Sequence, residues 1–405
     1  MRFGYFLNQN NLGLEKSFTQ LIEESREIAR YCDTNGWHSI WTTEHHFGHE
    51  GLEVCPNPIL MSADLAAHTK QIRIGQAANI ITFRHPIQIA EDIAMLDHLS
   101  GGRVEVGVGR GVYPREALNM NPVADVRDSK VNRALFDETL EIIRTAWTNE
   151  FFSYDGEFYT FPQPGVTFDH EMSPPLAQNT DPETGHITAL SLVPRPLQTP
   201  HPPLWRVVDT DPSIRGAGEA GINVMFWIPP TDALIPRFEL YRDALSERRG
   251  SEAAMGEGVA VLRDLFVTET MEDAEKLAGE AMVRYMNWVC YFRGLSNHRY
   301  PGEVLPDTEN KLDLLSYEFL HPRNMLFGTP EYVGEKIQEM QDKLDLKQLL
   351  LWSSLPGVEH EHAMASIEMF TEQVMPHFSE LGSSELESAE LDSAELESPE
   401  PELQS

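Results

Sequence analysis

The sequence has few cysteines and no long apolar run. Its 405 residues include only three cysteines, Cys32, Cys55 and Cys290. This odd number at wide spacing fits neither a disulfide framework nor a cysteine-ligated zinc site, so reduced thiols are expected. No apolar run approaches the roughly 18 residues of a membrane span. The first residues, MRFGYFLNQNN, lack the apolar stretch of a signal peptide. These absences predict a soluble cytoplasmic protein.

Basic residues are also scarce. The chain has 31 Lys and Arg against 64 Asp and Glu, for a formal net charge of −33. Such an excess of negative charge argues against non-specific binding to nucleic acid or to an anionic membrane. A phosphate-bearing ligand would therefore have to be held by particular arginines and not by the overall field.

Part of the acidic excess lies in one repetitive segment. Residues 383–402 read SSELE, SAELD, SAELE and SPEPE, four five-residue units with eight acids and no base. A leucine period of five suits burial in neither a helix nor a strand. We predict a disordered acidic tail over residues 381–405 and a single folded domain over residues 1–380.

Within that domain, short apolar runs alternate with amphipathic stretches. The predicted strands are 2–7, 39–43, 72–81, 103–109, 204–209, 222–227, 259–267 and 347–354. The helices that follow them are 16–35, 58–69, 87–99, 129–148, 212–220, 231–249, 271–288 and 360–375. Near-continuous apolar strands separated by helices indicate a parallel sheet covered on both faces. Eight such units favour a closed (β/α)₈ barrel, a TIM barrel, over an open doubly wound sheet.

Two long segments interrupt the alternation. Residues 150–203 are rich in proline and show no long periodicity, which predicts an extended loop after the fourth helix. Residues 292–325 form a second insertion after the seventh helix, before a helix that starts near Thr329. Long irregular segments in compact domains are often lids, so the second insertion is the candidate lid.

The stretch WTTEHHFGH follows the second predicted strand and contains Glu44, His45 and His46. In a (β/α)₈ barrel the active site lies at the carboxyl ends of the strands. Imidazoles titrate near neutral pH and can act as general acids or bases there; a solvated histidine pair is the alternative. No matching ligands follow the other strands, so no metal site is predicted.

Two further strand ends carry features of anion binding. After the fourth strand, GVGRGVY has glycines that let backbone approach a flat ligand, and Arg110 offers a fork for phosphate or carboxylate. After the fifth strand, DTDPS (209–213) combines capping side chains with a proline at a helix start, where free amides form an anion site. Helix capping alone is the other interpretation of DTDPS.

Several segments, taken in order, resemble the bacterial luciferase-like family of flavin monooxygenases, and within it the luciferase α chain. The likeness runs from residue 2 to about residue 378. The segments are FGYFL (3–7), WTTEHHF (41–47), HPIQIAEDIAMLDHLSGGR (85–103), GVGRGVY (107–113), NRALFDE (132–138), FGTPE (327–331) and MPHF (375–378).

The resemblance implies roles for individual residues. His45 corresponds to the catalytic histidine of the family, with Glu44 and His46 orienting it through hydrogen bonds. Other positions correspond to the flavin site of the family: a cis peptide beside the flavin ring, phosphate-binding arginines, a phosphate loop and further pocket positions. In that order they are Ala77 with Ala78, Arg110 with Arg133, Asp209 with Thr210 and Ser213, and Tyr113 with Glu116.

The same resemblance implies the reaction. Such a barrel binds reduced FMN, reacts it with dioxygen to a flavin hydroperoxide and oxygenates a small hydrophobic organic substrate. A separate flavin reductase supplies the FMN, and the subunit forms a homodimer or a heterodimer. Three alternatives stay open: a deazaflavin-dependent oxidoreductase, an aldehyde-oxidising luciferase, and a non-catalytic subunit similar to the luciferase β chain.

The sequence also departs from the luciferase α chain. Gly109 stands where that chain has a reactive cysteine, and the 150–203 loop is longer. Aromatic residues at or near strand ends indicate either an apolar substrate pocket or barrel core. They are Tyr5, Phe6, Tyr113, Trp227 and Trp352.

Overall fold

The structure, a computed structural model, describes residues 1–306 and 310–378 of the chain. The predicted acidic tail, residues 381–405, lies outside the described residues. None of the helices within the described ranges has both the length and the apolar character needed to cross a lipid bilayer.

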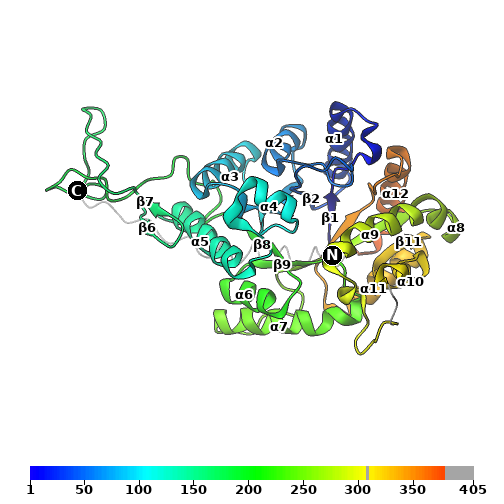
Figure 1. The fold of residues 1–405 in the computed structure, drawn as a ribbon. Coiled ribbons are helices and arrows are strands. Elements are labelled where there is room, and N and C mark those ends of the chain that lie inside the picture. The colour runs from blue at the N-terminus through cyan, green and yellow to red at the C-terminus, as the bar shows by residue number, and fades with distance from the viewer. Residues whose placement is uncertain (307–309, 379–405) are drawn as a thin grey trace, which may run out of the picture.

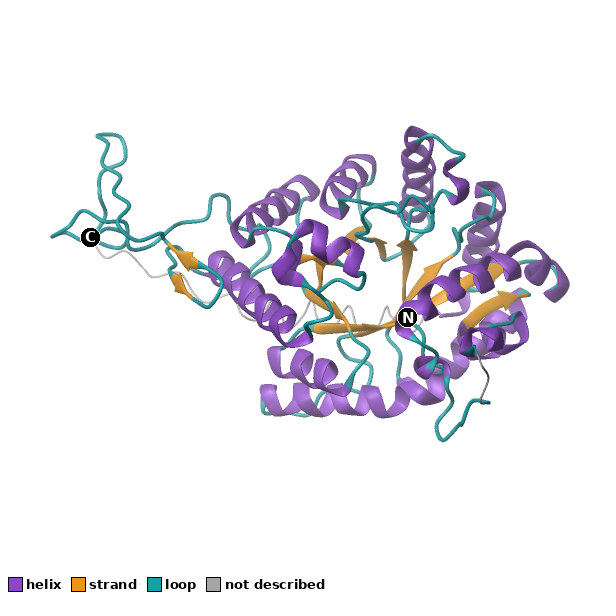
Figure 2. Ribbon diagram, viewed as in Figure 1, coloured by secondary structure: helices purple, strands orange, loops and turns teal. Residues whose placement is uncertain are grey.

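Within these residues, eight parallel strands close into a barrel surrounded by helices (Figures 1 and 2). The barrel order is β1, β2, β3, β5, β8, β9, β10, β12, and β12 pairs again with β1. The bounds are β1 Arg2–Leu7, β2 Ser39–Thr42, β3 Arg73–Gln76, β5 Val104–Gly109, β8 Leu204–Val207, β9 Asn223–Phe226, β10 Val259–Val267 and β12 Gln348–Trp352. The predicted (β/α)₈ barrel is confirmed.

The helices that follow these strands lie close to their predicted ranges. They are α1 Phe18–Thr34, α2 Pro58–His68, α3 Pro86–Ser100, α5 Ser129–Thr148, α6 Asp211–Ala220, α7 Thr231–Arg249 and α12 His360–Gln373. The predicted seventh helix is divided into α8 Met271–Ala274, a π-helical turn Glu275–Gly279 and α9 Glu280–Arg293. The helix expected near Thr329 is α11, Pro330–Leu344, with Thr329 as its N-cap.

Side chains alternate between two buried layers along the strands. Trp41 packs in one layer with Trp205, whereas its neighbour Ile40 packs in the other layer with helix residues such as Ile28. Gly75 is paired with Trp41 on the adjacent strand, and a Cβ at Gly75 would lie 2.2 Å from the indole ring. Large rings therefore fill the inner layer because a neighbouring strand supplies glycine.

The predicted strand 72–81 is not continuous. It is divided into β3 and a short β4, Asn79–Ile80, which pairs with β5. The peptide bond between Ala77 and Ala78 lies between the two strands and is cis. A run of apolar and small residues cannot by itself reveal this break, because its periodicity is that of a single buried strand.

The two insertions differ in how much regular secondary structure they contain. Residues 150–203 carry a small hairpin, β6 Tyr154–Asp155 with β7 Thr160–Phe161, and the chain after it extends away from the barrel (Figure 1). The 292–325 segment is less irregular than predicted. It contains α10, Tyr317–Asn324, and leads into β11, Met325–Gly328, which pairs with the end of β10.

The sequence pattern does not predict α10, because Pro322 lies inside that helix. Nor does it predict β11, because the four-residue strand directly follows the helix, with no turn residue between them. A further short helix, α4 Pro114–Met120, also went unpredicted, since seven residues are too few for a helical period to be read.

Candidate active site

Glu44 joins the histidine motif to the segment that follows the cis peptide. Its buried carboxylate accepts hydrogen bonds from the Ile80 amide at 2.8 Å and from Arg84 Nη2 at 3.2 Å. His46 Nε2 lies 3.0 Å from the same carboxylate. Glu44 therefore holds the ends of β2 and β4 together.

The two neighbouring histidines lie in different surroundings. His46 lines an outer pocket with Phe83, Arg84 and His85. His45 Nδ1 lies 3.4 Å from Glu53 Oε2 and 3.5 Å from Glu116 Oε1. The structure thus gives His45 and not His46 the paired carboxylates of a proton-transfer site.

Burial and charge act in opposite directions on His45. Burial lowers the pKa of His45, but the carboxylates of Glu53 and Glu116 outweigh burial and hold the net pKa above its ordinary value. The Arg293 guanidinium opposes them. The His45 side chain is 19% exposed, so it keeps some access to solvent or a ligand.

A buried hydrogen-bond chain positions Glu53. Tyr285 donates its hydroxyl to Glu53 Oε1 at 2.7 Å, and Asn8 Nδ2 donates to the same Tyr285 oxygen at 3.2 Å. Asn8 in turn accepts from Thr43 Oγ1 at 3.0 Å. Residues from three separate segments therefore fix the carboxylate beside His45.

The expected cis peptide packs against the end of β5. A Cβ at Gly107 would lie 1.8 Å from the Gln76 carbonyl oxygen, so only glycine allows this approach. A Cβ at Gly109 would lie 3.4 Å from Ala78 Cβ and 3.0 Å from Ile80 Cδ1. Gly109 thus borders the Ala77–Ala78 segment.

Tyr113 lies between the histidine and α9. Its ring centroid is 5.7 Å from that of His45, and its oxygen accepts a hydrogen bond from Trp288 Nε1 at 3.1 Å. Phe292 packs against the Tyr113 ring edge to face at 4.9 Å. Burial raises the pKa of the Tyr113 hydroxyl, so it stays protonated at neutral pH.

A different electrostatic environment surrounds one turn of α5. Arg110 Nη1 donates to Asn132 Oδ1 at 3.2 Å, and Arg133 is the next residue of that turn. Arg206, from β8, lies over the Phe136 ring at 4.6 Å. Burial, and then the neighbouring Arg133, lower the pKa of Arg110. The three guanidinium groups therefore form one cluster, the arginine cluster.

The start of α6 lies at the end of β8. Thr210 is the N-cap, and its amide donates to Ser213 Oγ at 3.2 Å. Asp209, from the same predicted phosphate loop, accepts a hydrogen bond at Oδ2 from Arg293 Nη1 at 2.9 Å. Arg293 ends α9 and so connects the 292–325 insertion to the DTDPS loop.

The structure distributes the predicted aromatic residues between pocket and core. Tyr5 is fully buried in the outer layer against Trp37, so it belongs to the core. Phe6, Trp227 and Trp352 lie in the inner layer with Tyr285. There Trp227 Nε1 donates to Asp264 Oδ1 at 3.3 Å, and burial raises the pKa of Asp264 to about 7.

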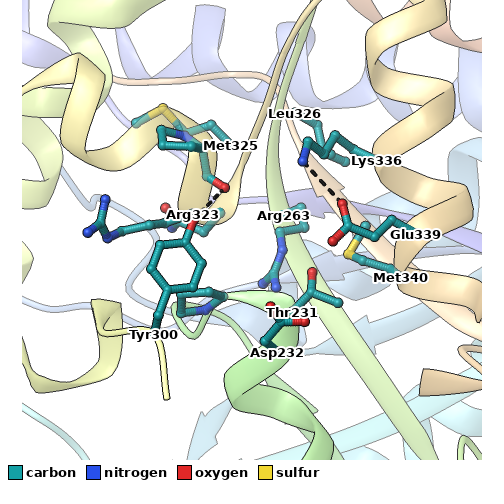
Figure 3. Close-up of a pocket in the computed structure, with 13 residues that line it drawn as sticks. Thr231, Asp232, Arg263, Tyr300, Arg323, Met325, Leu326, Lys336, Glu339 and Met340 are labelled. Carbon is teal, nitrogen blue, oxygen red and sulfur yellow. Dashed lines mark hydrogen bonds and ion pairs between the residues drawn. The ribbon is translucent and has the colours of Figure 1, made fainter. Parts of the chain in front are cut away.

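A pocket of about 220 Å³ beside Arg263 is lined by none of the predicted site residues (Figure 3). The amino end of β10 pairs with β9 and its carboxyl end pairs with β11, so the two partners diverge from β10. Buried Arg263 lies between the two pairings and donates to the carbonyls of Trp227 and Pro229. The arginine replaces missing strand hydrogen bonds, which gives this pocket a structural explanation.

Four residues of the site were not found from the sequence: Glu53, Arg206, Tyr285 and Arg293. Arg206 had a signal, since it is a charged residue inside the apolar run LWRVVD. No sequence signal points to Glu53, Tyr285 or Arg293. Polar and amphipathic residues are ordinary in a loop, where Glu53 lies, and on a helix, where Tyr285 and Arg293 lie.

The chain matches known proteins over most of its length. A family model described as luciferase-like monooxygenase matches residues 1–345. The chain is 27% identical over 391 residues to the oxygenase component of flavin-dependent trigonelline monooxygenase from Acinetobacter baylyi, covering 94% of this chain and 96% of that protein. It is 24% identical over 394 residues to an alkanal monooxygenase alpha chain from Photorhabdus luminescens, covering 94% and 98%.

A solved structure agrees with the fold. The oxygenating constituent of 3,6-diketocamphane monooxygenase from Pseudomonas putida, in complex with FMN, has a TM-score of 0.73 and 22% identity, covering 93% of this chain and 98% of that chain. Because the family model spans most of the sequence, the chain belongs to the luciferase-like monooxygenase family and is a flavin-dependent monooxygenase.

Proposed function

We propose that this chain is the oxygenase component of a two-component system that uses reduced FMN and dioxygen to oxygenate a small hydrophobic organic substrate. The observation that carries the proposal is that a carboxylate-paired histidine follows β2, while a cluster of arginines from β8, α5 and the end of β5 lies further round the same barrel. The trigonelline relative, described as an oxygenase component, supports the two-component arrangement.

The residues present fit FMN. Arg110 and Arg133 have no ion pair among the described residues, so their charges are available to a phosphate. Thr210 and Ser213 cap a helix start at the end of β8, and the free amides of such a start favour an anion. Ala77 and Ala78 would face the flavin ring. Reduced FMN, when bound, supplies the electrons that activate dioxygen.

The protein's part in the reaction is to control protons and water. His45 Nδ1 faces Glu53 and Glu116, which leaves Nε2 to exchange a proton with the reacting groups. Glu44 and His46 fix the backbone from which His45 projects. The 292–325 segment acts as the lid that limits water, and Arg293, its second residue, anchors it to Asp209.

The remaining features of the assembly follow the same proposal. A flavin reductase delivers the reduced FMN. Residues 1–380 form the catalytic domain. The subunit acts as a homodimer or a heterodimer in the cytoplasm, and light scattering of the purified chain measures its oligomeric state.

The test is dioxygen consumption by the full chain with photoreduced FMN. Aldehydes, cyclic ketones and aromatic N-heterocycles are then screened for a substrate-dependent product that contains one oxygen atom from ¹⁸O₂. Labelled product supports the proposal. Hydride transfer from a reduced deazaflavin without dioxygen uptake would favour the deazaflavin alternative. Flavin binding with no turnover of any kind would favour the non-catalytic subunit.

A further inference from the structure

We propose that Arg206 is a third phosphate-binding residue, which completes a site for a dianionic phosphate monoester with Arg110 and Arg133. The inference rests on the proposed function, since it concerns the same cofactor. It adds a residue from β8 that neither the histidine motif nor the DTDPS loop contains.

The position of Arg206 on its strand directs its side chain toward α5. Leu204 and Val208, two residues away on either side, pack in the outer layer, whereas Trp205 packs in the inner layer. Arg206 therefore points outward, and its guanidinium lies over the Phe136 ring at 4.6 Å. Phe136 lies one helical turn after Arg133, so both arginines meet the same turn of α5.

The three guanidinium groups are not neutralised by their neighbours. Within residues 1–306 and 310–378, the guanidinium groups of Arg206 and Arg133 have no ion pair or hydrogen bond, and that of Arg110 bonds only to the neutral amide of Asn132. Asp137, on the same helix face, is the carboxylate that acts on both Arg110 and Arg206. Three cations and one carboxylate leave an excess of two positive charges, in a chain whose net charge is −33.

Keeping three neighbouring guanidinium groups charged and partly buried costs free energy unless an anion is bound among them. Arg206 is 8% exposed, and burial together with the two other arginines lowers its pKa to about 10, so it remains charged at neutral pH. A buried charge needs a partner of opposite sign, and the aromatic face supplies only part of that compensation. A phosphate dianion carries the two negative charges that the cluster lacks.

The alternative is that Arg206 only packs on Phe136 and stabilises α5. The packing role and the phosphate-binding role predict different effects on the affinities for FMN and riboflavin. A packing role would change the free energy of unfolding and alter the affinities for FMN and riboflavin alike. A phosphate role would weaken FMN binding and leave riboflavin binding unchanged, because riboflavin lacks the phosphate.

The experiment uses the full chain with Arg206→Met, which keeps an unbranched apolar stem on Phe136 but removes the charge. Arg215→Met is the matched control, since Arg215 lies on α6 with a side chain 48% exposed. Dissociation constants for oxidised FMN and for riboflavin are measured by flavin fluorescence. We expect FMN binding to weaken about 10- to 100-fold in Arg206→Met, as for a lost charge-assisted bond, and to stay unchanged in the control.

Equal weakening of FMN and riboflavin, or no change in either, would overturn the role of Arg206. If Arg206→Met does not fold, Arg206→Lys serves the same test. It keeps the charge but loses the fork, so weakening for FMN alone supports the proposal, and equal affinities for wild type and variant overturn it. A wild-type chain that does not prefer FMN to riboflavin would overturn the proposed function as well. Loss in Arg110→Leu without loss in Arg206→Met would overturn this inference alone.

Discussion

The histidine side and the arginine side of the barrel mouth differ in how their charges are paired. Around His45, polar groups contact one another: Glu53 accepts from Tyr285, and Glu116 Oε1 accepts from the His46 amide at 2.7 Å. Around Arg206, three guanidinium groups lie together with one carboxylate. The first region is organised by the protein itself, whereas the second is balanced only when an anion is bound.

This difference assigns distinct tasks to the two regions. A group that must move a proton needs fixed partners, because its pKa and its orientation decide its efficiency. A group that must hold a ligand needs hydrogen-bond donors or charge without partners in the protein, because such partners would compete with the ligand. Substitutions on the histidine side should therefore affect the reaction, and substitutions on the arginine side should affect cofactor affinity.

The largest effect is expected for His45→Ala. Loss of acid–base help should lower the rate of oxygenation by roughly two to four orders of magnitude, while FMN affinity stays nearly unchanged. Steady-state product formation and a flavin titration measure the two quantities. His49→Ala is the control, because the His49 side chain is 85% exposed. Equal activity of His45→Ala and wild type would remove His45 from the reaction.

The next effect is expected for Arg110→Leu and Arg133→Leu. Each should weaken FMN binding by about 1.5 to 3 kcal/mol, the worth of a hydrogen bond to a charged group. Turnover at saturating FMN should fall much less. Titration with FMN and riboflavin measures the loss. The assignment of the phosphate to this side is wrong if both variants bind FMN as tightly as wild type.

A smaller effect on stability is expected for Glu44→Gln. The substitution replaces one acceptor oxygen with an amide that cannot accept from Ile80, Arg84 and His46 together. The free energy of unfolding should fall by about 1 to 3 kcal/mol, the cost of a buried unsatisfied partner. Urea denaturation measures it. Glu50→Gln in the same loop is the control, because the Glu50 side chain is 20% exposed and pairs with Arg115, whereas the Glu44 side chain is fully buried. A loss no larger than that of the control would mean that Glu44 does not hold β2 to β4.

The smallest effect is expected for Glu53→Gln, which should change the pKa of His45. Removing the Glu53 charge leaves burial with less opposition, so the pKa of His45 should fall. NMR titration of the imidazole measures this directly. In wild type the raised pKa contributes stability that is complete below the ordinary histidine value and is lost as the pH rises through the folded-state pKa. Glu53→Gln should therefore lose more stability at acidic than at alkaline pH, and a uniform loss would contradict the pairing.

Most of the fold could be predicted from the sequence, because the strands and helices follow from local patterns of apolar and polar residues. The eight apolar runs and the helices between them are each specified by residues close in the chain, and β10 and α7 match their predicted ranges, 259–267 and 231–249. Elements whose pattern is short or contains a proline were missed, as α4 and α10 show.

Without the family resemblance, which also pointed to Arg133 and Glu116, the candidate site was predictable only where its residues follow a strand. His45, Arg110 and Thr210 do so, and their positions could be read from the motif and the barrel geometry together. The carboxylates beside His45 could not be placed there from the sequence, because Glu53 comes from a loop and Glu116 from an unpredicted helix. Tyr285, which donates to Glu53, comes from α9.

Tyr285 and Glu53 are 232 positions apart in the sequence, and only the closed barrel with α9 packed over its mouth brings them together. The sequence by itself determined the barrel, the residues at its strand ends and the family, since periodicity and motifs act over short distances. Tertiary structure alone decided which of two adjacent histidines has the carboxylates, and which buried arginine joins the other two. The surroundings of His45 and of Arg206 depend on the side of the strand to which each side chain points and on the distant segment that packs against that side.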